Sequence, residues 1–121
     1  MAEMNMFMHA SGSQSFEPGA TLFRQGDTGE VMFAVVEGEV ELTRNGSVVD
    51  VIGPGGIIGE LALIDPAPRT ATATARTSAR VVPVDKREFM FLVQEHPTFA
   101  LQVMTVMADR IRKTNDAISP T

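Results

Sequence analysis

Glycine-containing turns divide residues 15–85 into short runs with strand character, and this pattern constrains the fold more than any other feature. The run Val31–Val36 is almost continuously apolar, which is typical of a well-buried strand, whereas Val40–Thr43 alternates with a period of two, as a half-exposed strand does. Asn45-Gly46 then predicts a type I′ hairpin turn, because both central residues of that turn need positive φ. Ser47–Ile52 is the predicted return strand. Many short strands at this spacing predict a β-sandwich, a jelly roll or a barrel.

The remaining runs extend this pattern and set the domain organisation. Further strands are predicted at Thr21–Arg24, Thr70–Ala75 and Arg80–Val84. A chain of 121 residues is long enough for one compact domain and too short for two. We therefore expect a loosely ordered N-terminal segment over residues 1–14 and a single domain over 15–121, with strands in 15–85 and C-terminal helices in 86–117.

The chemistry of the chain changes at Asp85, where two helices are predicted. Asp85 with Glu88 three residues later forms a capping-box pattern at the start of the first helix. The second, Thr98–Asn115, has no internal Gly or Pro, and its apolar residues extend well beyond the single stripe that a surface helix needs. One face is therefore expected to pack on the strands, and the rest to meet a second subunit or close over a ligand. A deeply buried core helix and a helix cut from a larger protein are the alternatives.

The stretch GELALIDPAPRTAT, which begins at Gly59, carries the residues best suited to binding a small ligand. A short helix starting near Glu60 would offer unpaired backbone N–H groups and the positive end of its dipole, and Gly59 leaves room for an anion such as phosphate to approach. Pro66 and Pro68 stiffen the approach to Arg69, which can reach the same anion through two parallel hydrogen bonds. Thr70 adds a hydroxyl.

Glu60 needs a different partner, since a carboxylate repels phosphate and accepts hydrogen bonds only. It suits a neighbouring hydroxyl such as a ribose 2′-OH, or it pairs with Arg69. The stretch therefore predicts a small ligand that carries an anionic group beside a hydroxyl. The alternative is an ordinary structural salt bridge between Glu60 and Arg69.

Composition argues against several other classes of function. The net charge is −5, which disfavours direct nucleic-acid binding, and no run of about eighteen apolar residues predicts a membrane span. The chain has no Cys, which fits a reducing cytoplasm, and its N-terminus is a poor signal peptide. His9 and His96 are far apart and neither falls on a predicted strand, which disfavours a cupin-type metalloenzyme. We expect no catalytic residue, no metal and no cofactor other than the ligand.

An ordered series of short motifs resembles the cyclic nucleotide-binding domain, which catabolite activator protein, the regulatory domains of protein kinases A and G, and cyclic-nucleotide-gated channels share. The resemblance covers roughly residues 16–115. It implies a mainly β fold, an eight-stranded jelly-roll-like β-roll with flanking helices and a short helix in its phosphate-binding cassette. The motifs are Glu17-Pro18-Gly19, the Gly26-Asp27 turn, Val36-Glu37-Gly38-Glu39-Val40, Ile52-Gly53-Pro54-Gly55, and the cassette from GELAL to PRTAT.

The resemblance also implies a role for each residue of the cassette. Glu60 would accept a hydrogen bond from the ribose 2′-OH, and Arg69 would pair with an exocyclic oxygen of the cyclic phosphate. Gly59 would permit the tight entry of the chain. The cradle around the phosphate would be completed by the amides of Leu61, Ala62 and Ala71 with the hydroxyl of Thr70.

Two places bear on which base is bound. In related kinases and channels, a threonine directly after the arginine is associated with contacts to guanine, so Thr70 leaves cGMP open. Thr114-Asn115 falls where catabolite activator protein carries a Thr-Ser pair facing adenine, although the pair is also compatible with a plain polar helix end. We expect cAMP to be preferred over cGMP.

The predicted function is a cyclic nucleotide sensor that transmits occupancy through its last helix to an effector protein not identifiable from the sequence. The apolar surface of that helix also suggests a homodimer. Two alternatives are a regulatory domain excised from a channel or transcription factor, and a degenerate member of the family kept as an interaction module.

Overall fold

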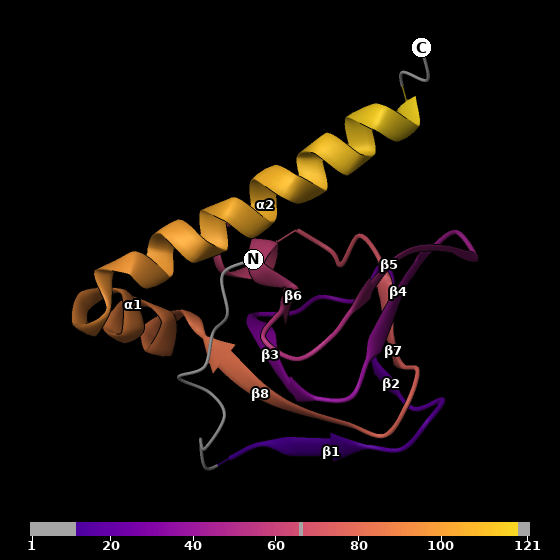
Figure 1. Ribbon diagram of the computed structural model, residues 1–121, viewed down its shortest axis with the longest axis horizontal. Helices are drawn as coiled ribbons and strands as arrows, with labels where there is room; N and C mark the ends of the chain where they lie inside the picture. Colours follow the sequence, from indigo (N-terminus) through magenta and orange to yellow (C-terminus); the bar gives the residue numbers. More distant parts are fainter. Residues whose placement is uncertain (1–11, 66, 119–121) are drawn as a thin grey trace.

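Two four-stranded antiparallel sheets and two C-terminal helices make up the fold (Figure 1). The computed structural model describes residues 12–65 and 67–118. One sheet has the strand order β1-β8-β3-β6 and the other the order β2-β7-β4-β5. The strands are β1 (Gln14–Phe16), β2 (Thr21–Phe23), β3 (Val31–Glu37), β4 (Val40–Arg44), β5 (Ser47–Ile52), β6 (Ile57–Ile58), β7 (Thr72–Ala75) and β8 (Ala79–Asp85).

This arrangement confirms the predicted eight-stranded β-roll. β5 has the predicted bounds, and the hairpin that it forms with β4 turns through Asn45 and Gly46, whose φ angles are 53° and 84°. Both angles are positive, as a type I′ turn requires. β7 begins two residues later than predicted, at Thr72. β1 begins at Gln14, one residue before the expected start of the domain, and residues 1–11 of the predicted N-terminal segment lie outside the described residues.

β3 is buried on both sides, which explains why its sequence is apolar without alternation. Met32, Ala34 and Val36 face a cluster shared with the helices, whereas Phe33 and Val35 face the interior of the roll. Successive side chains of a strand point to opposite faces, so a strand between two apolar layers needs apolar residues at every position. The two clusters therefore place β3 at the centre of the domain.

The first helix, α1 (Lys86–Glu95), begins as the sequence predicts. Asp85 is its N-cap, and its carboxylate accepts a hydrogen bond from the Glu88 amide at 2.8 Å. The Glu88 carboxylate accepts one from the Asp85 amide at 3.3 Å, which completes the capping box.

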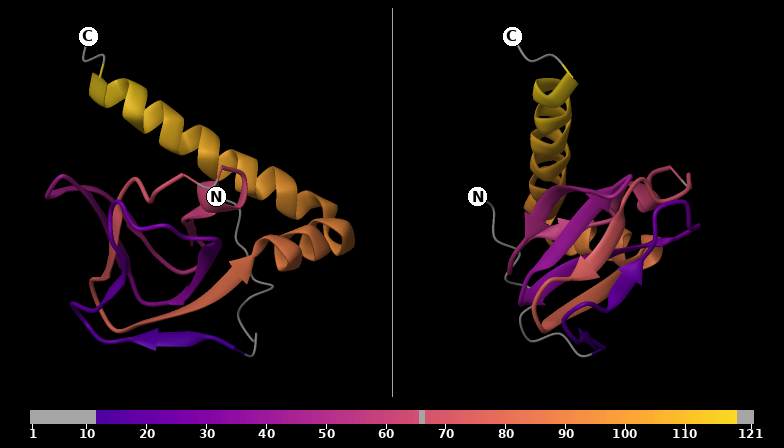
Figure 2. Two further views of the ribbon diagram at one scale, coloured as in Figure 1. Left: turned by 180° about the vertical axis from the view of Figure 1, so that it is seen from behind. Right: turned by 90° about the vertical axis from the view of Figure 1, so that its right-hand side faces the viewer.

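The second helix, α2 (Pro97–Ile118), is longer than predicted and crosses over the roll above the segment that follows β6 (Figure 1). Figure 2 shows its C-terminal half projecting beyond the strands. Phe99 and Val103 pack into the core that α2 shares with β3 and β8, whereas Leu101, Met104 and Ile111 are about 60% exposed (64%, 59% and 61%). One face therefore packs on the roll as expected and further apolar surface is exposed, whereas the expected second subunit or ligand for that surface stays a prediction. Within the described residues, neither helix combines the length and the apolar character needed to cross a membrane.

Candidate functional site

The cassette segment, residues 59–71, begins with a glycine that no other residue can replace without strain. Gly59 has φ 73°, and a Cβ built there would lie 2.5 Å from Nη1 of Arg69. The short helix that follows is a single 3₁₀ turn, η2 (Glu60–Leu63), rather than an α-helix. The positive φ and the close approach of Arg69 both require glycine at this position.

Arg69 is buried next to the loop between β2 and β3. Its amide donates to the Asp27 carbonyl at 2.7 Å, and its own carbonyl accepts from the Gly26 amide at 2.8 Å. Only 8% of the residue is exposed. Backbone pairing therefore fixes the point from which the side chain starts, although Arg69 is far from this loop in the sequence.

The guanidinium of Arg69 is surrounded by neutral groups. Its Nη1 donates to the Gly59 carbonyl at 3.2 Å and its Nη2 to the Val31 carbonyl at 2.7 Å, while its carbon Cζ lies 4.2 Å from the centre of the Phe23 ring. Its Nε has no hydrogen-bond partner, and no carboxylate of the described residues lies within ion-pair distance. Burial lowers the pKa of Arg69, and the more distant carboxylate of Asp27 opposes this effect. Arg69 is thus a buried cation with donor capacity left for an anion.

Glu60 is paired with a residue that the sequence did not single out. Its carboxylate, in a residue only 4% exposed, forms an ion pair with Arg110 of α2. Arg110 also donates to the Ile57 carbonyl just before the cassette segment. Burial lowers the pKa of Arg110, opposed by the carboxylate of Asp50. The alternative of a salt bridge between Glu60 and Arg69 is therefore not what the structure contains.

A second ion pair joins α2 to the roll one turn further along. Nζ of Lys113 lies 3.2 Å from Oδ2 of Asp50 on β5, with the lysine side chain 62% exposed and the aspartate 20%. The middle of α2 is thus attached to the roll by one buried pair and one largely exposed pair.

The other predicted residues lie in the same segment with different exposure. The Ala62 amide donates to the Gly59 carbonyl at 3.2 Å, so it is engaged in closing the turn. Leu61 is 51% exposed and Ala71 is buried. Thr70 is exposed, and its backbone carbonyl accepts a hydrogen bond from Nε of Arg44 at 3.2 Å. Thr114 and Asn115 belong to α2, but their side chains lie outside the described part of the chain.

Sequence reasoning missed Arg110, although the sequence contained a signal for it. Residues 99, 103 and 110 of a helix lie on one face, because they are separated by four and seven positions. Phe99 and Val103 are apolar residues of the packing face, so Arg110 places a charge where the helix meets the roll. A cation on a buried face needs a partner, and Glu60 was the acid whose own partner was in question.

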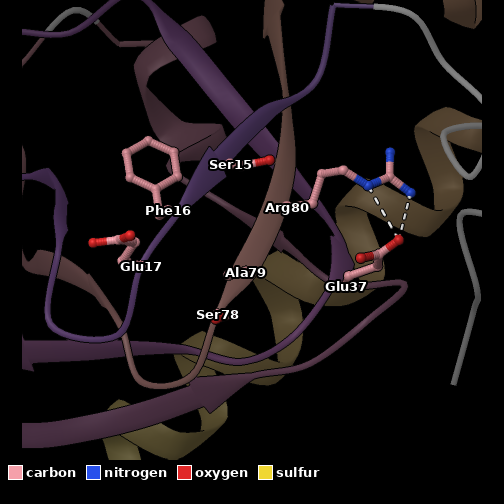
Figure 3. A pocket seen from close by; sticks show the side chains of 7 residues that line it. All are labelled: Ser15, Phe16, Glu17, Glu37, Ser78, Ala79 and Arg80. Atoms are coloured by element: carbon pink, nitrogen blue, oxygen red, sulfur yellow. Dashed lines mark hydrogen bonds and ion pairs between the residues drawn. The ribbon is translucent and has the colours of Figure 1, made fainter.

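An open hollow of about 440 Å³ lies elsewhere on the molecule (Figure 3). Residues of β1 and of the adjoining ends of β3 and β8 line it, and Arg80 pairs with Glu37 at 3.0 Å at its rim. None of its lining residues belongs to the cassette segment. In the described part of the chain, no group of three or more His, Asp or Glu side chains is placed to hold a metal ion.

Most of the described chain, including the cassette segment, matches a known family. Residues 13–96 match the sequence model of the cyclic nucleotide-binding domain. This range includes Gly59, Glu60 and Arg69 but stops before Arg110.

Similar proteins come from more than one kind of longer protein. The chain is 30% identical over 109 residues to a CRP-like cAMP-activated global transcriptional regulator of Mycobacterium tuberculosis, with 86% of this chain and 49% of that protein covered. It is 37% identical over 93 residues to a cAMP-dependent protein kinase regulatory subunit of Yarrowia lipolytica, with coverage of 75% and 25%. The chain thus spans about half the length, or less, of these curated relatives.

A solved structure supports the same relationship. The catabolite activator protein of Thermus thermophilus superposes with a TM-score of 0.78 at 26% identity, covering 88% of this chain and 52% of that one. The likeness extends beyond the family match, since it takes in most of the chain.

Proposed function

The chain belongs to the cyclic nucleotide-binding domain family, and from this premise we propose that it binds a cyclic nucleotide at the cassette segment, with cAMP preferred over cGMP. The observation that carries the proposal is the state of Arg69. It is a buried guanidinium with an unpartnered Nε and, among the described residues, no carboxylate to neutralise it. An anionic ligand would supply the missing charge, and a cyclic phosphate has the oxygens to accept two parallel hydrogen bonds from it.

Glu60 is the proposed acceptor for the ribose hydroxyl, and Arg110 prepares it for that role. A carboxylate has about four acceptor positions on its two oxygens, so an ion pair with Arg110 leaves capacity for a hydroxyl. The pair also orients the Glu60 carboxylate. In the proposed complex, Thr70 and the amides of Leu61, Ala62 and Ala71 complete the cradle, and the Ala62 amide would have to exchange its bond to the Gly59 carbonyl for one to the phosphate.

The same ion pair is the proposed route from the ligand to the rest of the molecule. Arg110 lies on α2, so a ribose bound to Glu60 and a docked α2 would each favour the other. Such coupling is reciprocal: if the docked helix improves ligand affinity, then the ligand stabilises helix docking by the same factor. A partner protein in the cytoplasm would read the position of α2.

The preference for cAMP rests on the relatives and on the end of α2. Two of the relatives are described as cAMP-activated and cAMP-dependent. Thr114 and Asn115 are the proposed contacts to the base, and Thr70 is the reason that cGMP stays a weaker ligand rather than an excluded one.

Thermal unfolding with and without cAMP and cGMP tests the binding proposal. A ligand present at a hundred times its Kd should stabilise the fold by about 2.7 kcal/mol. We expect cAMP to reach a given stabilisation at a lower concentration than cGMP. No shift with either nucleotide would overturn the proposal and favour an interaction module that has lost its ligand.

Hydrogen exchange of the α2 amides tests the coupling. We expect cAMP to slow exchange in α2 of the wild type and to have no such effect in Arg110→Met, in which the link to Glu60 is removed. Equal protection of α2 in both proteins would show that occupancy reaches the helix by another route.

The exposed apolar stripe of α2 supports a second copy of this chain as a partner. Leu101, Met104 and Ile111 are spaced by three and seven residues, so they form one exposed stripe along the helix, separate from the face that packs on the roll. Sedimentation at several concentrations should show a dimer that Leu101→Glu abolishes. A monomer throughout the range would exclude this pairing.

A further inference from the structure

Phe23 and Gly29 both border the narrow slot that holds the guanidinium of Arg69. Phe23 ends β2, and its ring centre lies 4.2 Å from Cζ of Arg69. Gly29 lies in the loop before β3. A Cβ built on it would fall 2.5 Å from Nε, 2.5 Å from Nη2 and 2.6 Å from Cζ of Arg69. The guanidinium therefore lies over a ring and close to a glycine, and any larger residue at position 29 would occupy part of its place.

The Phe23 ring also packs against a second aromatic ring. Phe23 stacks on Phe33 of β3, with ring centres 6.0 Å apart and an angle of 24° between the rings. Phe33 is 8% exposed and lies in the interior cluster of the roll. The wall against which Arg69 rests is therefore continuous with the core.

Two carbonyls complete the slot and fix how the guanidinium is turned within it. The carbonyls of Gly59 and Val31 accept hydrogen bonds from Nη1 and Nη2. The edge of the guanidinium that carries Nε is therefore the one that stays available for a ligand. A planar cation over an aromatic face is attracted by the ring quadrupole, and an arginine stacks on such a face better than a lysine does. The ring thus restricts the tilt of the guanidinium while the carbonyls restrict its rotation.

We propose that Phe23 is a positioning residue for Arg69: its ring, with Gly29 leaving room beside it, holds the guanidinium oriented before any ligand arrives. This inference rests on the proposed function insofar as the oriented group is meant to meet a cyclic phosphate. A long side chain that is already ordered loses less conformational freedom on binding, and this raises affinity without adding a contact to the ligand.

Phe23 also packs against the interior cluster, so the test must separate its ring from its bulk. Phe23→Leu keeps an apolar side chain but removes the aromatic face, whereas Phe23→Tyr keeps the face. Gly29→Ala leaves Phe23 intact and pushes only the end of a flexible side chain out of the slot. Leu22→Val is the matched control, because Leu22 is a β2 neighbour packed on the same cluster and has no aromatic face.

The first measurement is made on the free protein. In a ¹H–¹⁵N spectrum, the Nε–H resonance of Arg69, identified by its absence in Arg69→Lys, should be shifted upfield by the ring current of Phe23. We expect Phe23→Leu and Gly29→Ala to remove this shift, and Phe23→Tyr and Leu22→Val to keep it. An unchanged Arg69 resonance in Phe23→Leu would overturn the inference.

The second measurement is the Kd for cAMP by calorimetry. Phe23→Leu should raise it about three- to tenfold, the scale of one cation–π contact. Phe23→Tyr and Leu22→Val should stay within about twofold. A resonance that moves in Phe23→Leu while the Kd does not would overturn the positioning role. If the wild type binds neither cAMP nor cGMP, the proposed function fails, and the spectrum alone decides whether Phe23 holds Arg69.

Discussion

Arg69 and Glu60 lie in one short segment and are both buried, yet their charges are stabilised in opposite ways. Arg69 is surrounded by two carbonyls, a ring and a glycine, all within or next to the strands. Glu60 is neutralised by Arg110, which comes from the last helix. A buried charge without a counter-ion is costly, whereas a paired one is tied to whatever carries its partner. On the proposed function, Arg69 would meet the charge of the ligand, and Glu60 would couple the ligand to α2 through Arg110.

Arg69→Leu tests the ligand side of this contrast and should have the largest effect. The loss of two charge-assisted hydrogen bonds to a phosphate, each worth about 1.5–3 kcal/mol, corresponds to a loss of cAMP affinity of about 100-fold or more. The free protein should still fold, since no ion pair is broken by the change. Titration calorimetry measures the affinity and circular dichroism the fold. Arg69→Lys should recover only part of the binding, and wild-type affinity in Arg69→Leu would remove Arg69 from the site.

The helix side of the contrast can be tested without any ligand. Removing one partner of a buried pair leaves the other charge uncompensated, which costs about 3–5 kcal/mol when both are fully buried. Because the Arg110 side chain is 24% exposed, we expect Arg110→Met to lower the free energy of unfolding by about 2–3 kcal/mol in urea denaturation.

A double-mutant cycle then separates the pair from the two side chains. Glu60→Gln should cost less on top of Arg110→Met than it does alone, because the charge that it removes no longer has a partner. Strictly additive losses would mean that the two residues do not stabilise each other. The same cycle on cAMP affinity shows how much of the role of Glu60 in binding depends on Arg110.

The features that could be predicted from the sequence are the local ones. The turns, the strand periods and the capping box are local features, so β5, the Asn45-Gly46 turn and the start of α1 could be predicted closely. Gly59, Glu60 and Arg69 could be named because they lie within a dozen residues of one another. The structure places the Arg69 guanidinium against Gly59, whereas Glu60 pairs with Arg110, and the ligand roles of all three residues remain predictions.

What could not be predicted depends on contacts across long stretches of chain. Phe23 and Gly29 meet Arg69 only because β2 pairs with β7, and Arg110 meets Glu60 only because α2 folds back over the roll. Strand pairing and helix docking are not encoded in any short window of sequence. The apolar residues of α2 extend beyond one stripe, which indicated two apolar faces but not the element that each face would contact.

Gly59→Ala acts on both regions and should have an intermediate effect. An alanine at φ 73° costs about 1–2 kcal/mol of stability, because its Cβ crowds the following carbonyl in the left-handed region. Its Cβ would also fall 2.5 Å from Nη1 of Arg69, so the guanidinium must shift. We expect lower stability by urea denaturation together with weaker cAMP binding. Gly46→Ala is the control, since Gly46 has φ 84° but open space around it, and should lower stability while leaving affinity unchanged.

Lys113→Ala should have the smallest effect, and it tests whether the Arg110–Glu60 pair differs from another ion pair that attaches α2 to the roll. The Lys113–Asp50 pair joins the same two elements as the Arg110–Glu60 pair, yet its lysine is mostly exposed. Exposed pairs contribute about 0–1 kcal/mol, so we expect a change in unfolding free energy near the lower end of that range and unaltered cAMP affinity. If Lys113→Ala weakened cAMP binding as much as Arg110→Met does, then any attachment of α2 to the roll would support ligand binding. A specific coupling role for Glu60 would then be excluded. If only Arg110→Met does so, the coupling passes through the carboxylate itself.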